Sequence, residues 1–465
     1  MNILLIEPDY RNKYPPLGLM KISTYHKNKG DAVAFYKGCS SKLRNQRWDR
    51  IYIASLFTFH WKKTIETIKY YKKSVKDPKD IYVGGVMASL LTDEIRRETG
   101  VVVIKGLLNQ KGVLGFEDDN QIDALAPDYF LLGDSLNGPE VYSYPTIDSY
   151  FVHATRGCVR HCKFCAVPFL EPTFFNGLSI LKQVKQIKNK FGEKRNLLIM
   201  DNNILASDRF PEIIEEIKEA GFKKGAKIAR IQNGREIHLK RVVDFNQGID
   251  ARLLNSKKMQ LISQIAIEPL RIAFDNIKYE KLYRRSVWLA AGCGIKILSN
   301  YILFNYRDTP EDFYKRLQIN IALNEELAKK GYFTRIWSFP MKYSPVLGEW
   351  SKNRKYVGEH WNRKYLRGIQ CILLATHGVV GPKRQFFEKA FGRTIREFKN
   401  LIRLPDVYII YRKKNEAKRK LLENRINGLT NKQKSAFYDM LIENNFKESD
   451  SDPKNKKILR ILSAY

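Results

Sequence analysis

Short apolar runs alternate with longer amphipathic segments along most of the chain, and this alternation restricts the fold more than any other feature. The first runs with the length of buried strands are 3–6, 51–55, 81–85 and 101–104, and helical patterns at 17–28 and 61–73 lie between them. Alternating strands and helices predict parallel sheets covered by helices. We therefore expect an α/β fold whose first domain, residues 1–148, is a doubly wound (Rossmann-like) sheet.

The same alternation continues through residues 149–345. Six further strand candidates lie at 149–155, 196–201, 242–247, 270–275, 296–304 and 333–339. Helical patterns at 178–191 and 211–220 separate the first three, while we assign no element to 225–240. Parallel strands joined by helices place ligands at the carboxyl ends of the strands. Functional residues are therefore expected just after each strand.

Three cysteines follow the first of these strands directly. Cys158, Cys162 and Cys165 form a C-x3-C-x2-C pattern. A closed structural zinc site needs four ligands, and a cubane iron–sulfur cluster normally takes four thiolates. Three thiolates on one loop would leave one iron of a 4Fe–4S cluster open to a small molecule. The alternatives are a Cys3His zinc site that uses His161, a disulfide with a spare thiol, and cysteines that only pack.

This spacing, with the aromatic Phe164 just before the third cysteine, resembles the signature of the radical S-adenosylmethionine (SAM) superfamily. The resemblance implies a partial (β/α)6 TIM-type barrel over 149–345 and a 4Fe–4S cluster on the three cysteines. It also implies reductive cleavage of SAM to a 5′-deoxyadenosyl radical, with electrons from a reductant such as flavodoxin or ferredoxin. The protein's share of such chemistry is to position the cofactor and to exclude side reactions.

Later segments match the superfamily's pattern in the right order. Asp201-Asn202-Asn203 follows the second strand, Asp250-Ala251-Arg252 follows the third and Asp275 follows the fourth. The fourth-strand segment, 273–276 with 281–285, is similar to that of the methylthiotransferase-like branch of the superfamily. Residues 300–313 are similar to the superfamily's fifth strand and the loop after it. In this chain, Asn305-Tyr306-Arg307 stands where relatives carry a small element. The resemblance implies that SAM is held by Phe164, Asp201, Asn202, Asp250, Arg252 and Asp275. Asp201 and Asp275 could instead cap helices.

The N-terminal domain resembles the cobalamin-binding-like domain that precedes many radical SAM domains. The matching residues are Pro15-Pro16-Leu17-Gly18-Leu19 and Gly84-Gly85. The D-x-H-x-x-G run whose histidine binds cobalt is missing from the sequence. Cobalamin is therefore expected to be absent, or to be bound without a protein histidine on cobalt.

The third domain, residues 346–465, is strongly basic. It holds 27 Lys and Arg against 12 Asp and Glu, which is 15 of the chain's net charge of +33. Cations interleaved with aromatic rings suit nucleic acid, although a charge run can equally be a solvated helix face. The candidate nucleic-acid residues are Arg412, Lys413, Lys414, Lys418, Arg419 and Lys420. We expect this region to be mainly helical.

These observations favour a cytoplasmic radical SAM enzyme, a transferase or oxidoreductase, that modifies an anionic substrate such as tRNA or other RNA or DNA. One alternative is a cobalamin-dependent radical SAM methyltransferase acting on a small molecule or peptide. Another is a non-catalytic nucleic-acid-binding protein with a structural metal. No apolar run reaches the length of a membrane span. The pattern assigns no role to Cys39, Cys293 or Cys371 and does not identify the substrate.

Overall fold

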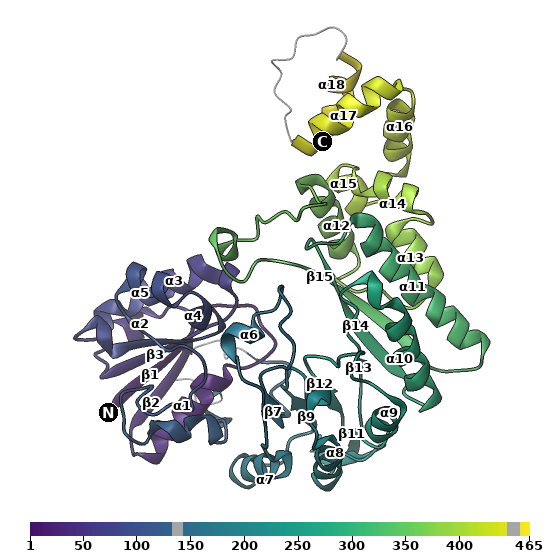
Figure 1. Ribbon diagram of the computed structural model, residues 1–465. Helices are drawn as coiled ribbons and strands as arrows, with labels where there is room; N and C mark the ends of the chain where they lie inside the picture. Colours follow the sequence, from purple (N-terminus) through teal and green to yellow (C-terminus); the bar gives the residue numbers. More distant parts are fainter. Residues whose placement is uncertain (133–142, 444–455) are drawn as a thin grey trace. The chain divides into compact units, whose positions relative to one another are not determined.

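The computed structural model describes residues 1–132, 143–443 and 456–465, and the chain divides into two compact units (Figure 1). Unit 1 is Met1–Leu270 together with Ser344–Tyr356, and unit 2 is Arg271–Tyr343 together with Val357–Tyr465. The chain therefore passes between the units three times. The domain limits expected above, 1–148, 149–345 and 346–465, stay a prediction.

Unit 1 begins with a five-stranded parallel sheet. Its strands are β1 (Asn2–Glu7), β2 (Ala32–Lys37), β3 (Arg50–Ser55), β4 (Ile81–Gly85) and β5 (Val102–Val103). Their order in the sheet is β2-β1-β3-β4-β5. The connecting helices are α1 (Leu17–Asn28), α2 (Ser41–Arg44), α3 (Trp61–Tyr71), α4 (Val86–Leu90) and α5 (Thr92–Thr99). This order is one of the two common doubly wound arrangements, so the expected α/β architecture is confirmed here.

Both faces of this sheet are covered, because successive side chains of a strand point to opposite faces. Leu4 and Ile6 of β1 share a buried cluster with Ile68 of α3 and Ile95 of α5. Ile3, which alternates with them, is equally buried, and α1 contacts β1 and β3. Figure 1 shows α3 and α5 on one side of the sheet and α1 on the other. The near-continuous apolar runs of the sequence follow from this double coverage.

A second parallel sheet in unit 1 carries the cysteine loop. Its strands β6 (Ser149–Val152), β9 (Asn196–Ile199) and β12 (Val243–Phe245) lie in the order β12-β9-β6. The other elements of this part are β7 (Thr155–Arg156), α6 (Val167–Leu170), β8 (Phe175–Asn176), α7 (Ile180–Phe191), α8 (Phe210–Glu219), the antiparallel hairpin of β10 (Lys227–Gln232) and β11 (Arg235–Lys240), and α9 (Ser256–Ile262). The register aligns Val152, Ile199 and Phe245. The residues that follow these three strands therefore share one edge.

The third sheet has the order β13-β14-β15 and belongs mainly to unit 2. Its strands are β13 (Leu270–Arg271), β14 (Ile297–Phe304) and β15 (Arg335–Lys342), with α10 (Glu280–Gly292) and α11 (Pro310–Lys329) between them. Within the described residues, the six expected strands thus form two three-stranded sheets. The closed arrangement of a partial barrel stays a prediction.

The C-terminal part of unit 2 is helical, as the sequence predicts. Its helices are α12 (Arg363–Ala375), α13 (Arg384–Phe391), α14 (Ile395–Ile402), α15 (Asp406–Ile410), α16 (Glu416–Asn427), α17 (Asn431–Glu443) and α18 (Lys456–Leu462). In the part of the chain that the structure describes, no helix combines the length and the apolar character needed to cross a membrane.

A buried arginine organises the central part of unit 2. Arg316 of α11 has no exposed surface. Its guanidinium donates to Oδ2 of Asp308 at 2.7 Å and to the carbonyl oxygens of Leu303, Phe274 and Asp275 at 2.8, 3.3 and 3.1 Å. These acceptors lie at or just beyond the ends of β13 and β14. One side chain therefore ties two strand ends and the 305–308 loop to α11.

The segment Ser344–Tyr356, here called the return segment, follows β15 and packs against the 3-10 helix Thr58–His60 and the start of α3, all within unit 1. It contains a short 3-10 helix, Glu349–Lys352. The ammonium of Lys352 lies 4.2 Å from the centre of the Trp61 ring, and the guanidinium of Arg354 lies 4.0 Å from that of Phe59. These cation–π contacts join the return segment to the start of α3.

Candidate functional site

The three cysteines lie on the loop that follows β7, at the edge shared by the carboxyl ends of β6, β9 and β12. All three are half-buried and none forms a disulfide. The amide of Arg160 donates to Sγ of Cys158 at 3.3 Å, and the amide of Val167 to Sγ of Cys165 at 3.5 Å. Amide groups directed at sulfur favour a thiolate and tune an iron–sulfur cluster.

A site for a single metal ion needs several ligand side chains around one point. Among the described residues, no group of three or more His, Cys, Asp or Glu side chains converges on a point that could hold one ion. His161, the fourth ligand of the zinc alternative, has an exposed side chain. The cluster and the zinc site both stay predictions.

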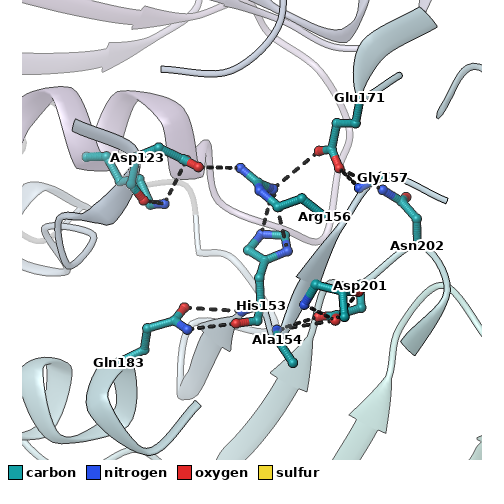
Figure 2. Close-up of polar contacts among 11 residues, drawn as sticks. Asp123, His153, Ala154, Arg156, Gly157, Glu171, Gln183, Asp201 and Asn202 are labelled. Atoms are coloured by element: carbon teal, nitrogen blue, oxygen red, sulfur yellow. Dashed lines mark hydrogen bonds and ion pairs between the residues drawn. The ribbon is translucent and has the colours of Figure 1, made fainter. Parts of the chain in front are cut away.

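The entry to the cysteine loop requires glycine. Gly157 has φ +71°, and a Cβ at this position would lie 2.4 Å from the carbonyl oxygen of Thr173. Its amide donates to Oε2 of Glu171 at 2.6 Å. The same carboxylate oxygen accepts a hydrogen bond from Nδ2 of Asn202 at 3.1 Å (Figure 2). Glu171 therefore fixes the start of the loop to the residues that follow β9.

Arg156, directly before Gly157, is the centre of a charged network shown in Figure 2. Its guanidinium pairs with Asp123 at 2.8 Å and with Glu171 at 3.3 Å, and donates to Nε2 of His153 at 3.1 Å. Loss of hydration and the positive charge of Arg156 hold the pKa of His153 well below its usual value. The imidazole is therefore neutral and serves as an acceptor.

The network extends to the N-terminal sheet through Lys21 of α1. Its ammonium pairs with Oδ1 of Asp123 at 3.0 Å. Burial would raise the pKa of Asp123, but the charges of Lys21 and Arg156 outweigh it and leave the pKa far below the usual value. The carboxylate stays ionised. The helix α1 and the base of the cysteine loop are thus joined by one ion-paired chain.

Asp201 faces away from the loop, toward the end of β6. Its carboxylate accepts hydrogen bonds from the amides of Ala154 and Thr155 at 2.9 and 2.5 Å and from the hydroxyl of Thr155 at 2.6 Å. Only 3% of the residue is exposed. Burial raises its pKa to about 6, although the Thr155 hydroxyl and these amides act in the opposite direction. These bonds indicate a positioning role, and direct contact with SAM stays a prediction.

Asn203, two residues further, is the member of the Asp201-Asn202-Asn203 run that meets a cysteine. Its Nδ2 lies 3.5 Å from Sγ of Cys158. Its Oδ1 is buried and has no hydrogen-bond partner in the described structure. A buried amide oxygen without a partner is costly. A cationic donor at this point would satisfy it.

The residues after β12 also reach the loop. Oδ2 of Asp250 accepts from Nε of Arg160, which lies between the first two cysteines, at 3.1 Å. Oδ1 accepts from Nε and the amide of Arg252 at 2.7 and 3.0 Å. Burial would raise the pKa of Asp250, but hydrogen bonds from the two arginines lower it. Asp250, bonded to both Arg160 and Arg252, therefore contacts the cysteine loop, whereas Asp201 and Asn202 bond to residues at the base of that loop.

Two other residues, Phe164 and Asp275, were also predicted to hold SAM. Phe164 is half-buried within the cysteine loop. Asp275 belongs to unit 2, where its carbonyl oxygen accepts from Arg316. The C-terminal basic residues also belong to unit 2: Lys413, Lys414, Lys418 and Lys420 are exposed, whereas Arg412 and Arg419 are half-buried.

The edge of the N-terminal sheet where cobalamin would be expected carries a buried ion pair. Nζ of Lys37 lies 2.6 Å from Oε2 of Glu7, at the end of β1. The hydroxyl of Tyr144 donates to the same carboxylate oxygen, and Asn12 donates to its other oxygen at 2.8 Å. These groups are hydrogen-bonded to each other and offer no histidine. Cobalamin stays a prediction of the resemblance alone.

The sequence placed Asn203 in the run Asp201-Asn202-Asn203, but it gave no role to Arg160, Glu171 or the His153–Arg156–Asp123 network. Arg160 lies inside the cysteine motif, so its position was a usable signal. Asp123 lies in a short 3-10 helix, Asp119–Ala124, and Glu171 directly follows α6, and neither segment is long enough to show a periodicity. Only the folded chain brings them to Arg156.

Comparison with known proteins gives little. No protein-family model matches the sequence, and no curated protein matches it. Among solved structures, the crystal structure of Streptococcus suis SuiB bound to S-adenosylmethionine aligns with a TM-score of 0.32 and 12% identity. The alignment covers 49% of this chain, and the chain spans about half of that protein, 47%. A likeness at this level carries no argument about function.

Proposed function

We propose that this protein is a radical SAM enzyme in which Cys158, Cys162 and Cys165 hold a 4Fe–4S cluster. The observation that carries the proposal is the position of the three-thiol loop. It leaves the carboxyl edge of a parallel sheet, and polar residues from the two neighbouring strands, β9 and β12, contact it there. When bound, such a cluster supplies the open iron that SAM occupies and the electron that cleaves it.

The chain's own residues fit this role in three ways. The amides of Arg160 and Val167 are directed at Cys158 and Cys165 and would donate to the sulfur ligands of a cluster. Asp250 holds Arg160 and so fixes the middle of the loop. The unpartnered Oδ1 of Asn203 lies beside Cys158 and is suited to accept from the ammonium group of SAM.

The decisive experiment is anaerobic. Protein reconstituted with iron and sulfide, then given dithionite and SAM, is expected to release 5′-deoxyadenosine. Cys162→Ala should abolish both iron uptake and release. Cys293→Ala is the matched control, because Cys293 is also a half-buried free thiol and lies outside the loop; it should keep both. Stoichiometric zinc without iron uptake would contradict the proposal.

A second variant tests the SAM contact separately. Asn203→Ala should retain the iron content of the parent but bind SAM about tenfold more weakly, because a charge-assisted hydrogen bond is lost. Equal SAM affinity at equal iron content would show that Asn203 has only a structural role. The candidate substrate of the radical, from sequence alone, is tRNA or another nucleic acid.

A further inference from the structure

A cavity of about 920 Å³ lies among the C-terminal helices of unit 2. Its walls come from the end of α13, from α14 and the turn after it, from α16 and α17, and from Tyr465. This volume lies within the range of small-molecule sites. All of its lining residues are far in sequence from the cysteine loop. The cysteine loop belongs to unit 1, so no residue of that loop is part of the cavity lining.

The lining is positively charged. Its basic members are Lys389, Arg396, Lys399, Arg403, Arg412, Arg419 and Lys434, and its acidic members are Glu388, Glu397 and Glu423. Lys399 pairs with Glu311, whereas Arg396 and Lys389 are exposed side chains at the opening. An excess of cations around a concave surface concentrates anions there.

Two guanidinium groups in the wall lack adequate compensation. Arg412 donates to the carbonyl oxygens of Lys389, Ala390 and Ile409, all of them neutral acceptors. Burial, together with the positive charge of Arg419, lowers the pKa of Arg412 to about 10. Nε of Arg419 is buried without a hydrogen-bond partner in the described structure, and its ion pair with Glu423 is long, at 3.8 Å. A bound anion would offset both charges.

Aromatic groups lie beside these charges. The guanidinium of Arg403 stacks over the Tyr438 ring, 4.0 Å from its centre. The hydroxyl of Tyr465 is buried and lacks a hydrogen-bond partner among the described residues. Arginine forks match the oxygens of a phosphate, and rings next to such forks stack on bases. The hydroxyl of Tyr465 and the Nε–H of Arg419 are the remaining groups that can form hydrogen bonds with a ligand.

We propose that this cavity binds a phosphate ester that carries an aromatic base, either as a free nucleotide or as a nucleotide within a single strand of nucleic acid. Arg419 and Arg396 contact the phosphate, and Tyr438 and Tyr465 contact the base. Arg412 holds the wall in place through the end of α13. The inference goes beyond the radical SAM proposal and does not depend on it.

The test uses the full chain without iron or SAM, so that failure of the cluster proposal leaves it unaffected. The probe is a fluorescein-labelled single-stranded RNA of about twelve nucleotides, followed by fluorescence anisotropy across a salt series. Arg419→Gln combined with Arg396→Gln should weaken binding about tenfold and reduce the salt slope by about one to two. Arg396→Glu alone is the second variant, because this exposed side chain is not needed for folding.

The matched control is Arg425→Gln combined with Lys432→Gln. It removes the same charge from helices of the cavity wall, α16 and α17, but from exposed residues outside the cavity. This control should bind within about twofold of the parent. Displacement of the RNA by unlabelled AMP would assign the site to a single nucleotide, and binding of RNA without displacement would assign it to a strand; either result supports the cavity. Equal weakening by both pairs, or binding of neither probe, would overturn it.

Discussion

Nε of Arg160, inside the cysteine loop, lies 3.1 Å from Oδ2 of Asp250, which follows β12 some 90 residues later. This ion pair fixes the middle of the loop against a neighbouring strand end. The side chain of Arg160 is 36% exposed, so its direct contribution to the free energy of unfolding is small, below about 1 kcal/mol. The ion pair matters because it sets the position of Cys158 and Cys162, which flank Arg160.

Arg160→Ala is therefore expected to separate assembly from stability. The melting temperature should stay near that of the parent, because Asp250 keeps its bonds to Arg252, while the iron retained after anaerobic reconstitution should fall by roughly half or more, because the cysteines are no longer held together. Iron analysis and a thermal melt of the same preparations check this. Full iron content in Arg160→Ala would show that the loop is positioned without this pair.

Gly157→Ala should destabilise the chain by more than about 3 kcal/mol, because the new Cβ combines a positive φ with a 2.4 Å approach to a carbonyl oxygen. Gly100→Ala is the control. Gly100 has a similar φ of +69°, but a Cβ there meets nothing within 4 Å. It should cost only about 1–2 kcal/mol. Urea denaturation of the metal-free variants measures the difference, and equal losses would contradict a steric cause.

The free energy of unfolding should change with pH because Asp201 titrates at a different pH in the folded chain than in the unfolded chain. Its pKa in the folded chain is about 6, against 3.8 for the unfolded reference. The folded state therefore holds the proton more tightly, so this group favours folding most below about pH 4, and the contribution is lost as pH rises through 6. The expected change is about 3 kcal/mol.

Urea denaturation of metal-free protein between pH 4 and pH 7, done on the parent and on Asp201→Asn, isolates this effect. The parent should lose stability relative to the variant across this interval. The variant should also be less stable by about 1–3 kcal/mol at low pH, because its NH2 group meets the Ala154 amide donor. Parallel profiles for the two proteins would show that Asp201 titrates normally.

Arg316→Met should cost about 3–5 kcal/mol, because Asp308 is then a buried carboxyl without its ion-pair partner. Burial already raises the pKa of Asp308. Adding Asp308→Asn should restore part of the loss, so that the double variant is more stable than the sum of the two single changes predicts. Thermal melts of the parent, the two single variants and the double variant complete this double-mutant cycle. Strict additivity would mean that the two side chains act independently.

Elements buried on both faces were predictable from sequence. The runs 3–6 and 51–55 lie in β1 and β3, and the expected strand 196–201 contains β9 and extends two residues beyond it. Such runs predict strands because a strand covered on both faces needs apolar residues throughout. The hairpin β10–β11 was not assigned, although its signal was present. Asn233-Gly234, both at positive φ, join alternating strands that pair from Gln232 and Arg235, which is the commonest hairpin turn chemistry.

The candidate site was predictable only in its motif residues. The cysteines, Asp201 and Asp250 follow strands, and parallel strands end at one edge, so their proximity could be inferred. The direction of the Asp201 side chain, toward Thr155 and not toward the cysteines, could not be predicted, because an aspartate after a strand can adopt either direction. Glu171 and Asp123 reach Arg156 only through tertiary packing, which no local pattern encodes.

The return segment has a consequence for how the protein is made. The contacts of Lys352 with Trp61 and of Arg354 with Phe59 join residues from opposite ends of unit 1. During synthesis from the N-terminus, unit 1 emerges long before Ser344–Tyr356, and β13, β14 and β15 are translated in between. Trp61 and Phe59 therefore gain their cation–π partners, Lys352 and Arg354, only after most of the chain has left the ribosome.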